Sequence, residues 1–230
     1  MSTTTYESLL PEILPMVYGC PDTYAEKSIR SAVIELCEKA AVYQQELDPV
    51  TTVANVYEYD FEPPRGTVVH KILWVTHEGK DLEPISTNLI EQRKPDWRNS
   101  SHYGKPEYYI KQSPSLFWLV PVPSTTQTSS TIMRAQLKPT HSSTACSTQV
   151  MDDYRDTIIN GALFRLLRTP SQPWTDLTGA QVYASMFSQG IVDAERRARH
   201  ADEGIARRVT YRGVGRYGSW RSKHRYGKGG

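Results

Sequence analysis

One stretch of the chain matches a nucleotide-binding motif. Gly213, Gly215 and Gly218 have the spacing G-x-G-x-x-G, which in a dinucleotide site joins a strand to a helix and precedes an acidic residue about 20 positions later. The 12 residues that follow Gly218 include no acid and no helical pattern. The match therefore indicates a glycine-rich segment, and we expect no cofactor.

Histidine and cysteine, the residues that most often bind metals, are scattered along the chain. No H-x-x-H, H-E-x-x-H or C-x-x-C pair is present, and such spacings are what bring two ligands to one metal ion. His70 and His77 fall in one predicted strand, but their odd separation directs the two rings to opposite faces. We expect ordinary surface histidines and no metal site.

Candidate nucleophiles and acid pairs are also weak. Cys37 falls in the apolar stripe of a predicted helix, where a buried and inert thiol is expected. Cys20 lies in a predicted loop and could be exposed, but nothing nearby would lower the pKa of its thiol. Asp152 and Asp153 are neighbours in a predicted helix and do not face each other. With no G-x-S-x-G motif either, we predict no catalytic residue and a protein that is not an enzyme.

The composition is that of a folded protein. The chain has 230 residues and 10% aromatic side chains, enough for one large domain or two small ones. Its longest apolar stretch, residues 116–122, contains Pro121 and is too short to cross a bilayer. No signal peptide is expected, and three cysteines without an even framework fit a reducing compartment. We expect no membrane partner.

The net charge of +2 conceals an uneven distribution. Residues 204–230, which we call the basic arm, hold eight Lys or Arg and no acid, and so carry +8. The other 203 residues hold 19 basic and 25 acidic side chains, and so carry −6. The arm also has seven of the 14 glycines and several aromatic residues. An acidic body with a basic, aromatic arm favours docking on an acidic surface elsewhere.

The basic arm is therefore the candidate binding site. Tyr, Trp and Arg dominate the strongest contacts of protein interfaces. We expect partner docking through Arg207, Arg208, Arg212, Arg216, Tyr217, Trp220, Arg221, Arg225 and Tyr226. The same residue types bind single-stranded nucleic acid, so a nucleic-acid-binding module is the alternative function. A solubilising tail is a third interpretation, which the aromatic residues disfavour.

The elements that position this arm begin with N-terminal helices in residues 1–45. A short helix is predicted over residues 5–14, and a longer one runs to about Tyr43. The longer helix begins with a capping box at Thr23 and Glu26 and has one apolar stripe. The stripe comprises Ala25, Ile29, Ala32, Val33, Leu36, Cys37 and Ala40.

Residues 46–148 predict an inserted antiparallel β domain. Runs of β-branched and aromatic residues alternate with turn signals at close spacing, which favours hairpins over crossover connections. A small helix, Ser86 to Arg93, interrupts the strands. We expect residues 124–131 to be a hairpin tip or exposed loop and residues 141–148 a flexible connector.

Residues 149–203 predict the C-terminal helices. One begins near Asp152, with Asp152 and Asp153 in its first turn, where the helix dipole favours acids, and ends before Pro170. Another runs from about Asp176 to His200. The predicted fold class is α+β: one bundle from the N- and C-terminal helices, an inserted antiparallel β domain, and an extended basic C-terminal arm over residues 204–230.

Several stretches of the chain, in order, resemble the head-to-tail adaptor proteins of short-tailed bacteriophages, also called head completion or tail tubular A-like proteins. They are residues 14–22 (LPMVYGCPD), 25–38, 47–50, 57–59, 118–123, 137–139, 152–154, 161–163 and 165–176. The resemblance covers residues from about 6 to 200 and leaves out the basic arm.

This resemblance implies a structural protein of the virion tail or neck, synthesised in the host cytoplasm. Such adaptors form a homo-dodecameric ring under the portal protein and receive the tail nozzle protein below, and a tail fibre protein is a further candidate partner. DNA passes through the lumen of the ring without specific binding. An acidic body suits that role because it repels phosphate.

Overall fold

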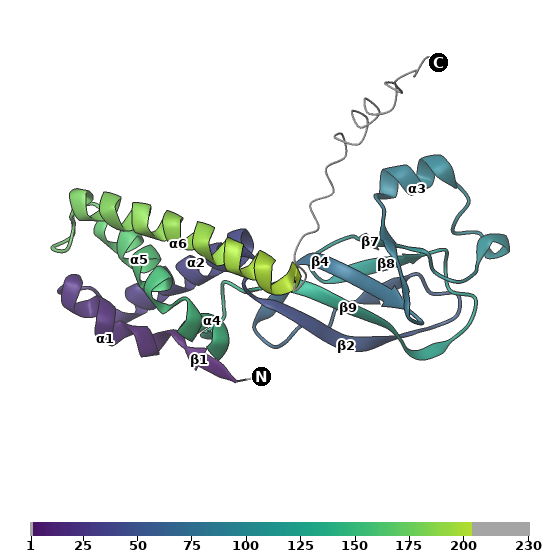
Figure 1. Ribbon diagram of the computed structural model, residues 1–230, viewed down its shortest axis with the longest axis horizontal. Coiled ribbons are helices and arrows are strands. Elements are labelled where there is room, and N and C mark those ends of the chain that lie inside the picture. The colour runs from purple at the N-terminus through teal and green to yellow at the C-terminus, as the bar shows by residue number, and fades with distance from the viewer. Residues whose placement is uncertain (1, 204–230) are drawn as a thin grey trace, which may run out of the picture.

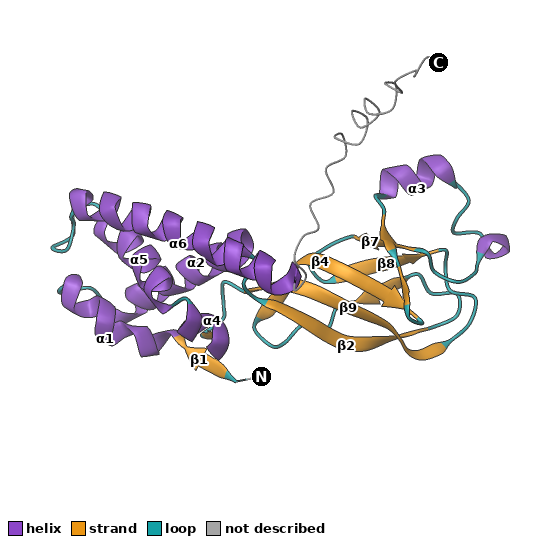
Figure 2. Cartoon of the chain, in the orientation of Figure 1, coloured by secondary structure: helices purple, strands orange, loops and turns teal. Residues whose placement is uncertain are grey.

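The structure is a computed structural model that describes residues 2–203 (Figure 1). The molecule is elongated, with helices from both ends of the described chain at one end and strands at the other (Figure 2). Helix α6, Leu177–Glu203, runs from the far tip of the helical part to its junction with the sheets. The predicted α+β fold class is thus confirmed.

The helical part is formed by segments from before and after the sheets. They are η1 Tyr6–Leu9, α1 Leu10–Ile13, η2 Leu14–Met16, α2 Asp22–Ala40, α4 Thr148–Asp153, α5 Arg155–Leu167 and α6. The short helix predicted over residues 5–14 exists as η1 and α1, and its apolar side chains Tyr6, Leu9 and Ile13 are fully buried. A small two-stranded sheet, β1 Thr3–Thr5 with β10 Ala145–Ser147, ties the two segments together.

Helix α2 has the predicted apolar stripe but not the predicted ends. All seven stripe residues are buried. The capping box at Thr23 and Glu26 is wrong, because the N-cap is Pro21, in extended conformation, and Thr23 lies inside the first turn. The carbonyl of Pro21 accepts the first helical hydrogen bonds from Tyr24 and Ala25. The helix ends at Ala40 rather than near Tyr43, because Ala41 takes the left-handed conformation, with φ 52°.

Helix α5 packs closely between α2 and α6. Gly161 makes this approach possible: a Cβ at this position would lie 2.6 Å from the Phe187 ring on α6 and 2.9 Å from Cβ of Ala32 on α2. Such distances lie well inside van der Waals contact. The three helices therefore form one tightly packed unit.

The start of the C-terminal helices differs from the prediction. Tyr154, with φ −119° and ψ 24°, separates α4 from α5. Asp152 and Asp153 therefore lie at the C-terminal end of α4 and not in a first helical turn. The predicted connector over residues 141–148 is wrong in its second half, where β10 and the start of α4 lie.

The β part contains two four-stranded sheets, ordered β2-β9-β4-β5 and β3-β8-β7-β6. Their strands are β2 Gln44–Thr52, β3 Glu58–Asp60, β4 Thr67–His77, β5 Lys80–Asp81, β6 Glu83–Pro84, β7 Tyr108–Lys111, β8 Leu116–Val120 and β9 Gln127–Pro139. Apolar residues of both sheets, such as Val75, Met133 and Phe117, belong to one buried core that continues into the helical part. Helix α3, Thr87–Arg93, begins at Ser86 as predicted, where the side chain accepts a hydrogen bond from the amide of Leu89.

One prediction for this part is wrong. Residues 127–131, expected in a hairpin tip or exposed loop, form the first part of β9, where the backbone pairs with β2 and β4. The predicted antiparallel sheets are present, with one exception: β6 and β7 pair in parallel across the segment that contains α3. The remaining strand pairs are antiparallel.

Helices and sheets are joined by hydrogen bonds as well as by the linker after α2. The buried side chain of Gln136 on β9 donates to the carbonyl oxygens of Cys37 (2.6 Å) and Glu38 (3.1 Å) at the end of α2. Lys138 forms an ion pair with Glu38 at 2.5 Å. These bonds satisfy carbonyls that the helix end leaves unpaired and fix the sheet against α2.

Candidate functional site

The residues predicted to dock a partner cannot be placed. Arg207, Arg208, Arg212, Arg216, Tyr217, Trp220, Arg221, Arg225 and Tyr226 all lie outside the described residues. Docking through the basic arm stays a prediction. The described residues instead present surfaces that the sequence did not single out.

The histidines of β4 have different environments. His77 is buried, contrary to the expected surface position, and its Nδ1 lies 3.0 Å from Oγ1 of Thr131. Burial lowers the pKa of His77, and Glu78 partly opposes this change. His70 is half-buried on the same strand. Within residues 2–203, no three His, Cys, Asp or Glu side chains are grouped so that they could hold a metal ion.

The three cysteines are free and buried. Cys20, whose predicted loop left exposure open, is only 8% accessible, and burial raises the pKa of its thiol. Cys37 is fully buried, as predicted, and the structure brings it to Cys146 on β10. Two effects raise the pKa of Cys37: the hydrogen bond with the thiol of Cys146 is the larger, and burial is the smaller. The sequence could not indicate this pair, because Cys37 and Cys146 are 109 positions apart.

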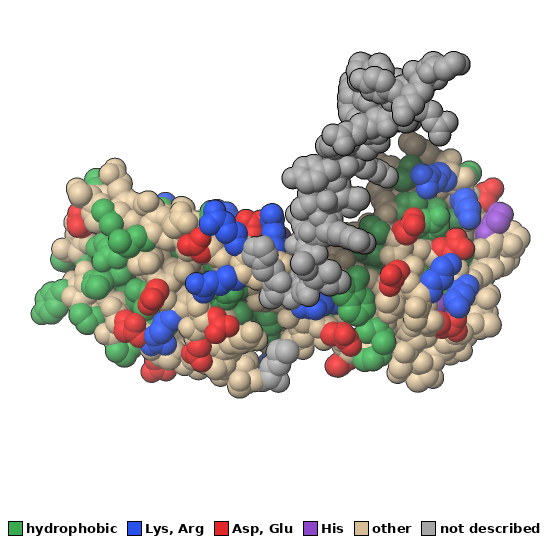
Figure 3. Space-filling view, viewed as in Figure 1, with side chains coloured by type: hydrophobic (Ala, Val, Ile, Leu, Met, Phe, Trp, Pro, Cys, Tyr) green, Lys and Arg blue, Asp and Glu red, His purple; other side chains and the backbone are tan. Residues whose placement is uncertain are grey.

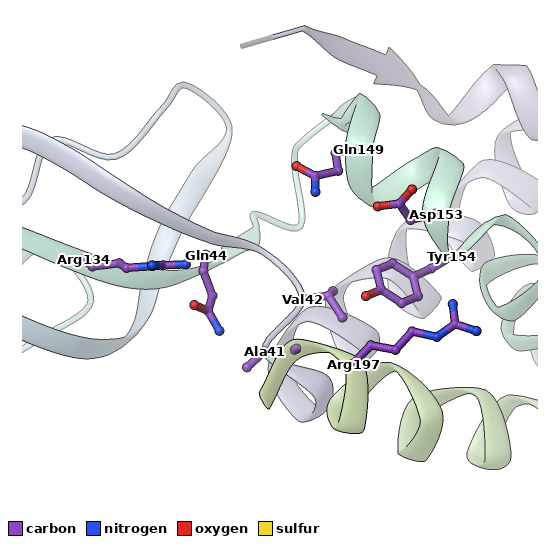
Figure 4. Close-up of a pocket in the computed structure, with 9 residues that line it drawn as sticks. Ala41, Val42, Gln44, Arg134, Gln149, Asp153, Tyr154 and Arg197 are labelled. Carbon is purple, nitrogen blue, oxygen red and sulfur yellow. The ribbon is translucent and has the colours of Figure 1, made fainter. Parts of the chain in front are cut away.

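A cleft of about 480 Å³ lies where the helical part meets the sheets (Figure 4). Gln44 of β2 and Arg134 of β9 line it from the sheet side, while Asp153, Tyr154 and Arg197 line it from the helical side. The cleft is polar and carries both signs of charge. Such a surface binds the side chains of a protein partner better than an apolar ligand.

The groups of the cleft influence one another. Burial raises the pKa of Tyr154, Asp153 adds to the effect, and Arg197 opposes it. Oε1 of Gln44 is buried and accepts no hydrogen bond from the described residues. Among the described residues that line the cleft there is no cysteine, serine or histidine.

The far tip of the helical part is apolar (Figure 3). Tyr18 is 90% exposed, Leu177 63% and Met16 55%, although such side chains favour burial. The hydroxyl of Tyr183 on α6 reaches Sδ of Met16 at 3.5 Å, which brings the two chain segments together. Val182 and Met186 continue the exposed apolar side chains along α6. We call these six residues the apolar tip. Contiguous exposed apolar surface is typical of a protein interface.

An aromatic cluster beside the sheet β3-β8-β7-β6 is covered by a side chain of the same chain, Arg98. Tyr57 contacts Trp97 and Trp118 edge-on, each at 5.5 Å between ring centroids. The guanidinium of Arg98 lies 4.3 Å from the Trp97 ring centroid. Trp118 donates to Glu58 at 2.8 Å. These contacts hold the segment after α3 against the sheet. We therefore assign the cluster a structural role.

The family model described as SU10 adaptor protein matches residues 5–212 of the chain. The match spans the helical part, both sheets and the start of the basic arm. The chain belongs to the SU10 adaptor protein family. The resemblance to phage head-to-tail adaptors is thereby confirmed at the level of the family, and the chain is a phage adaptor protein, a component of the virion. No curated protein matches it.

The extent of the family match bears on the arm of this adaptor. It ends at Arg212, so Arg207, Arg208 and Arg212 lie within it, whereas the docking residues from Arg216 onward lie beyond it. The resemblance seen in the sequence ended near residue 200, before the arm. Among the described residues, no helix of this adaptor is long and apolar enough to cross a membrane.

Proposed function

We propose that this adaptor forms a twelve-membered ring that docks on the portal protein, receives the tail nozzle protein, and encloses part of the DNA conduit. The family match over residues 5–212 carries the proposal, because it includes both the helical and the β parts. The protein acts through its surfaces, without catalysis or a cofactor. A tail fibre protein is a further candidate partner on the outside of the ring.

The division of the chain suits such a ring. We assign residues 1–45 and 149–203 to the helical bundle, 46–148 to the inserted β domain and 204–230 to the docking arm. Subunits of a ring meet head-to-tail, so each needs two different surfaces that fit one another. The apolar tip and the polar cleft are chemically different and lie at opposite ends of the helical part. They provide contacts to two kinds of neighbour.

The test is assembly with purified portal rings, followed by electron cryo-microscopy. We expect the full chain alone to be a monomer or a weak oligomer in sedimentation velocity, and to form a closed twelve-fold ring on the portal. A stable closed ring without portal would contradict the expected assembly order. Failure to bind portal rings at physiological salt would contradict the proposal itself.

The salt dependence of DNA binding distinguishes the nucleic-acid-binding alternative from the proposed function. A protein that neutralises several phosphates loses affinity steeply as salt rises. The acidic body disfavours such binding, because residues 1–203 carry −6. Tight and strongly salt-dependent binding of duplex or single-stranded DNA, without binding to portal, would favour the alternative.

A further inference from the structure

A second recess lies between α2 and α5, and cations line it. Its volume is about 380 Å³, and the residues that matter are Tyr24, Lys27 and Ser31 on α2 with Arg165, Arg168 and Thr169 at the end of α5. We call these six residues the basic recess. None of the described residues that line it is an Asp or Glu. It is separate from the cleft at the junction, with which it shares no residue.

Two of the three cations are available to a ligand. Arg165 is fully engaged, since it forms an ion pair with Glu35 and donates to the carbonyl of Gly161 at 2.5 Å. Lys27 and Arg168 form no ion pair with an Asp or Glu among residues 2–199. The hydroxyl of Ser31 donates to the backbone at 2.9 Å, so the ammonium of Lys27 and the guanidinium of Arg168 are the donors that face an incoming anion.

The surroundings of Arg165 indicate which kind of ligand Arg168 could bind. Its guanidinium lies 5.2 Å from the Phe187 ring centroid and binds a carboxylate, that of Glu35. The guanidinium of Arg168 also lies beside an aromatic ring, 4.9 Å from the centroid of Phe164. Unlike Arg165, it forms no ion pair with a carboxylate among residues 2–199. Burial lowers the pKa of Arg165, Glu35 opposes this effect, and Arg168 adds to it. An anion beside Arg168 would relieve the repulsion between the two cations.

The described body supplies carboxylates for such a contact. From Gln44 to Pro64 the chain has five acids and no Lys, Arg or His. Strands β2 and β3 of this segment are each an edge strand of their sheet. Four of these acids, which we call the acidic edge, are exposed: Glu46, Asp48, Asp60 and Glu62. None of them forms an ion pair with a side chain of residues 2–199.

We propose that the basic recess of one subunit binds carboxylates of the acidic edge of a second copy of this chain. The inference rests on the proposed ring and names one contact between its subunits. Charge complementarity supports it: Lys27 and Arg168 line the recess, and the segment from Gln44 to Pro64, which carries the acidic edge, has five acids and no Lys, Arg or His. A phosphate backbone is a poorer occupant, because a polyanion would bring a long run of negative charge along a body whose residues 1–203 carry −6.

The test measures self-association of the full chain without portal. Sedimentation velocity at high protein concentration should show weak association that decreases as salt rises. The double variant Lys27→Glu/Arg168→Glu should weaken association about tenfold or more, because attraction becomes repulsion. Arg93→Glu/Lys94→Glu, with the same change of charge at the other end of the molecule, is the matched control and should associate like the wild type.

A charge-swapped variant, in which both surfaces are reversed, tests the contact more directly than the recess variant alone. Adding Asp48→Lys/Asp60→Lys to the recess variant should recover association, whereas these edge substitutions alone should weaken it. Absence of wild-type association, or equal association of recess variant and control, would overturn the proposal. So would binding of a labelled oligothymidylate that the recess variant loses while its self-association is unchanged. Binding to portal rings is measured separately, so the proposed function can stand if this contact fails.

Discussion

Leu163 is fully buried in the helical part, in the same core as α2 and α6. Replacing Leu163 by Ala should lower the free energy of unfolding by about 2–5 kcal/mol, because it removes buried methyl groups and leaves a cavity. Leu177→Ala at the exposed tip is the matched control and should change stability by less than about 0.5 kcal/mol. Urea unfolding measures both. Equal effects of the two substitutions would show that the assignment of the core is wrong.

His77 makes stability depend on pH. Its pKa lies below the ordinary value of 6.5 because of burial, so the folded protein resists protonation more than the unfolded chain does. As the pH falls through about 6.5, the unfolded chain takes up the proton first, and the free energy of unfolding decreases. In His77→Gln this part of the decrease should be absent. The measurement is urea unfolding from pH 8 to pH 5, and an identical slope in the variant would contradict the assignment.

Individual residues show what spacing predicts and what it misses. The stripe of α2 was predicted correctly, because period and burial are both local properties of one helix. Cys146 beside Cys37, and Met16 beside Tyr183, join residues more than 100 positions apart. No spacing rule reports such pairs, because they depend on how the elements pack.

At the scale of the elements, the ends of helices can be tested directly. Asp176 is the side chain that caps α6: its Oδ1 accepts hydrogen bonds from the amides of Thr178 and Gly179, each at 3.0 Å. Asp176→Ala should destabilise the protein by about 1 kcal/mol. Thr23→Ala, within the first turn of α2, should cost less than about 0.5 kcal/mol. Thermal or urea unfolding compares them, and a larger loss for Thr23→Ala would favour the capping box after all.

The errors in the elements have physical causes. The capping box failed because the backbone conformation of Pro21, and not the residue types at Thr23 and Glu26, decides where α2 begins. Residues 127–131 are mostly Ser and Thr, and they enter β9 because two strands offer hydrogen-bond partners. Parallel pairing of β6 with β7 depends on how the chain returns after α3. Each outcome is decided by tertiary pairing, which overrides local propensity.

At the scale of the whole molecule, the body and the basic arm differ in charge, and we expect them to have separate roles. The buried core comprises residues from Tyr6 to Ala194, so stability of the body depends on residues that precede the arm. The net charge of −6 on residues 1–203 opposes approach to an acidic surface, whereas the +8 charge of the arm favours it. The sequence located this charge division, whereas the apolar tip, the cleft and the basic recess required the fold.

Removal of residues 204–230 tests this separation. The truncated chain should keep its melting temperature within about 2 °C, because it retains every described core residue, but it should no longer bind portal rings. An extended segment of 27 residues spans on the order of 90 Å, enough to cross a neighbouring subunit. Its arginines would form charge-assisted hydrogen bonds with acids there, and its Tyr and Trp side chains would fill apolar recesses.

Two further variants of the full chain identify which property of the arm matters. Arg212, Arg216, Arg221 and Arg225 changed to Gln should weaken portal binding and reduce its dependence on salt, because the charges that respond to salt are gone. Tyr217→Ser/Trp220→Ser should weaken binding but leave the salt dependence in place. Arg93→Gln/Lys94→Gln on the body is the charge control. If the truncated chain joined portal rings as tightly as the full chain at physiological salt, docking would have to occur through the body, with the apolar tip as the next surface to test.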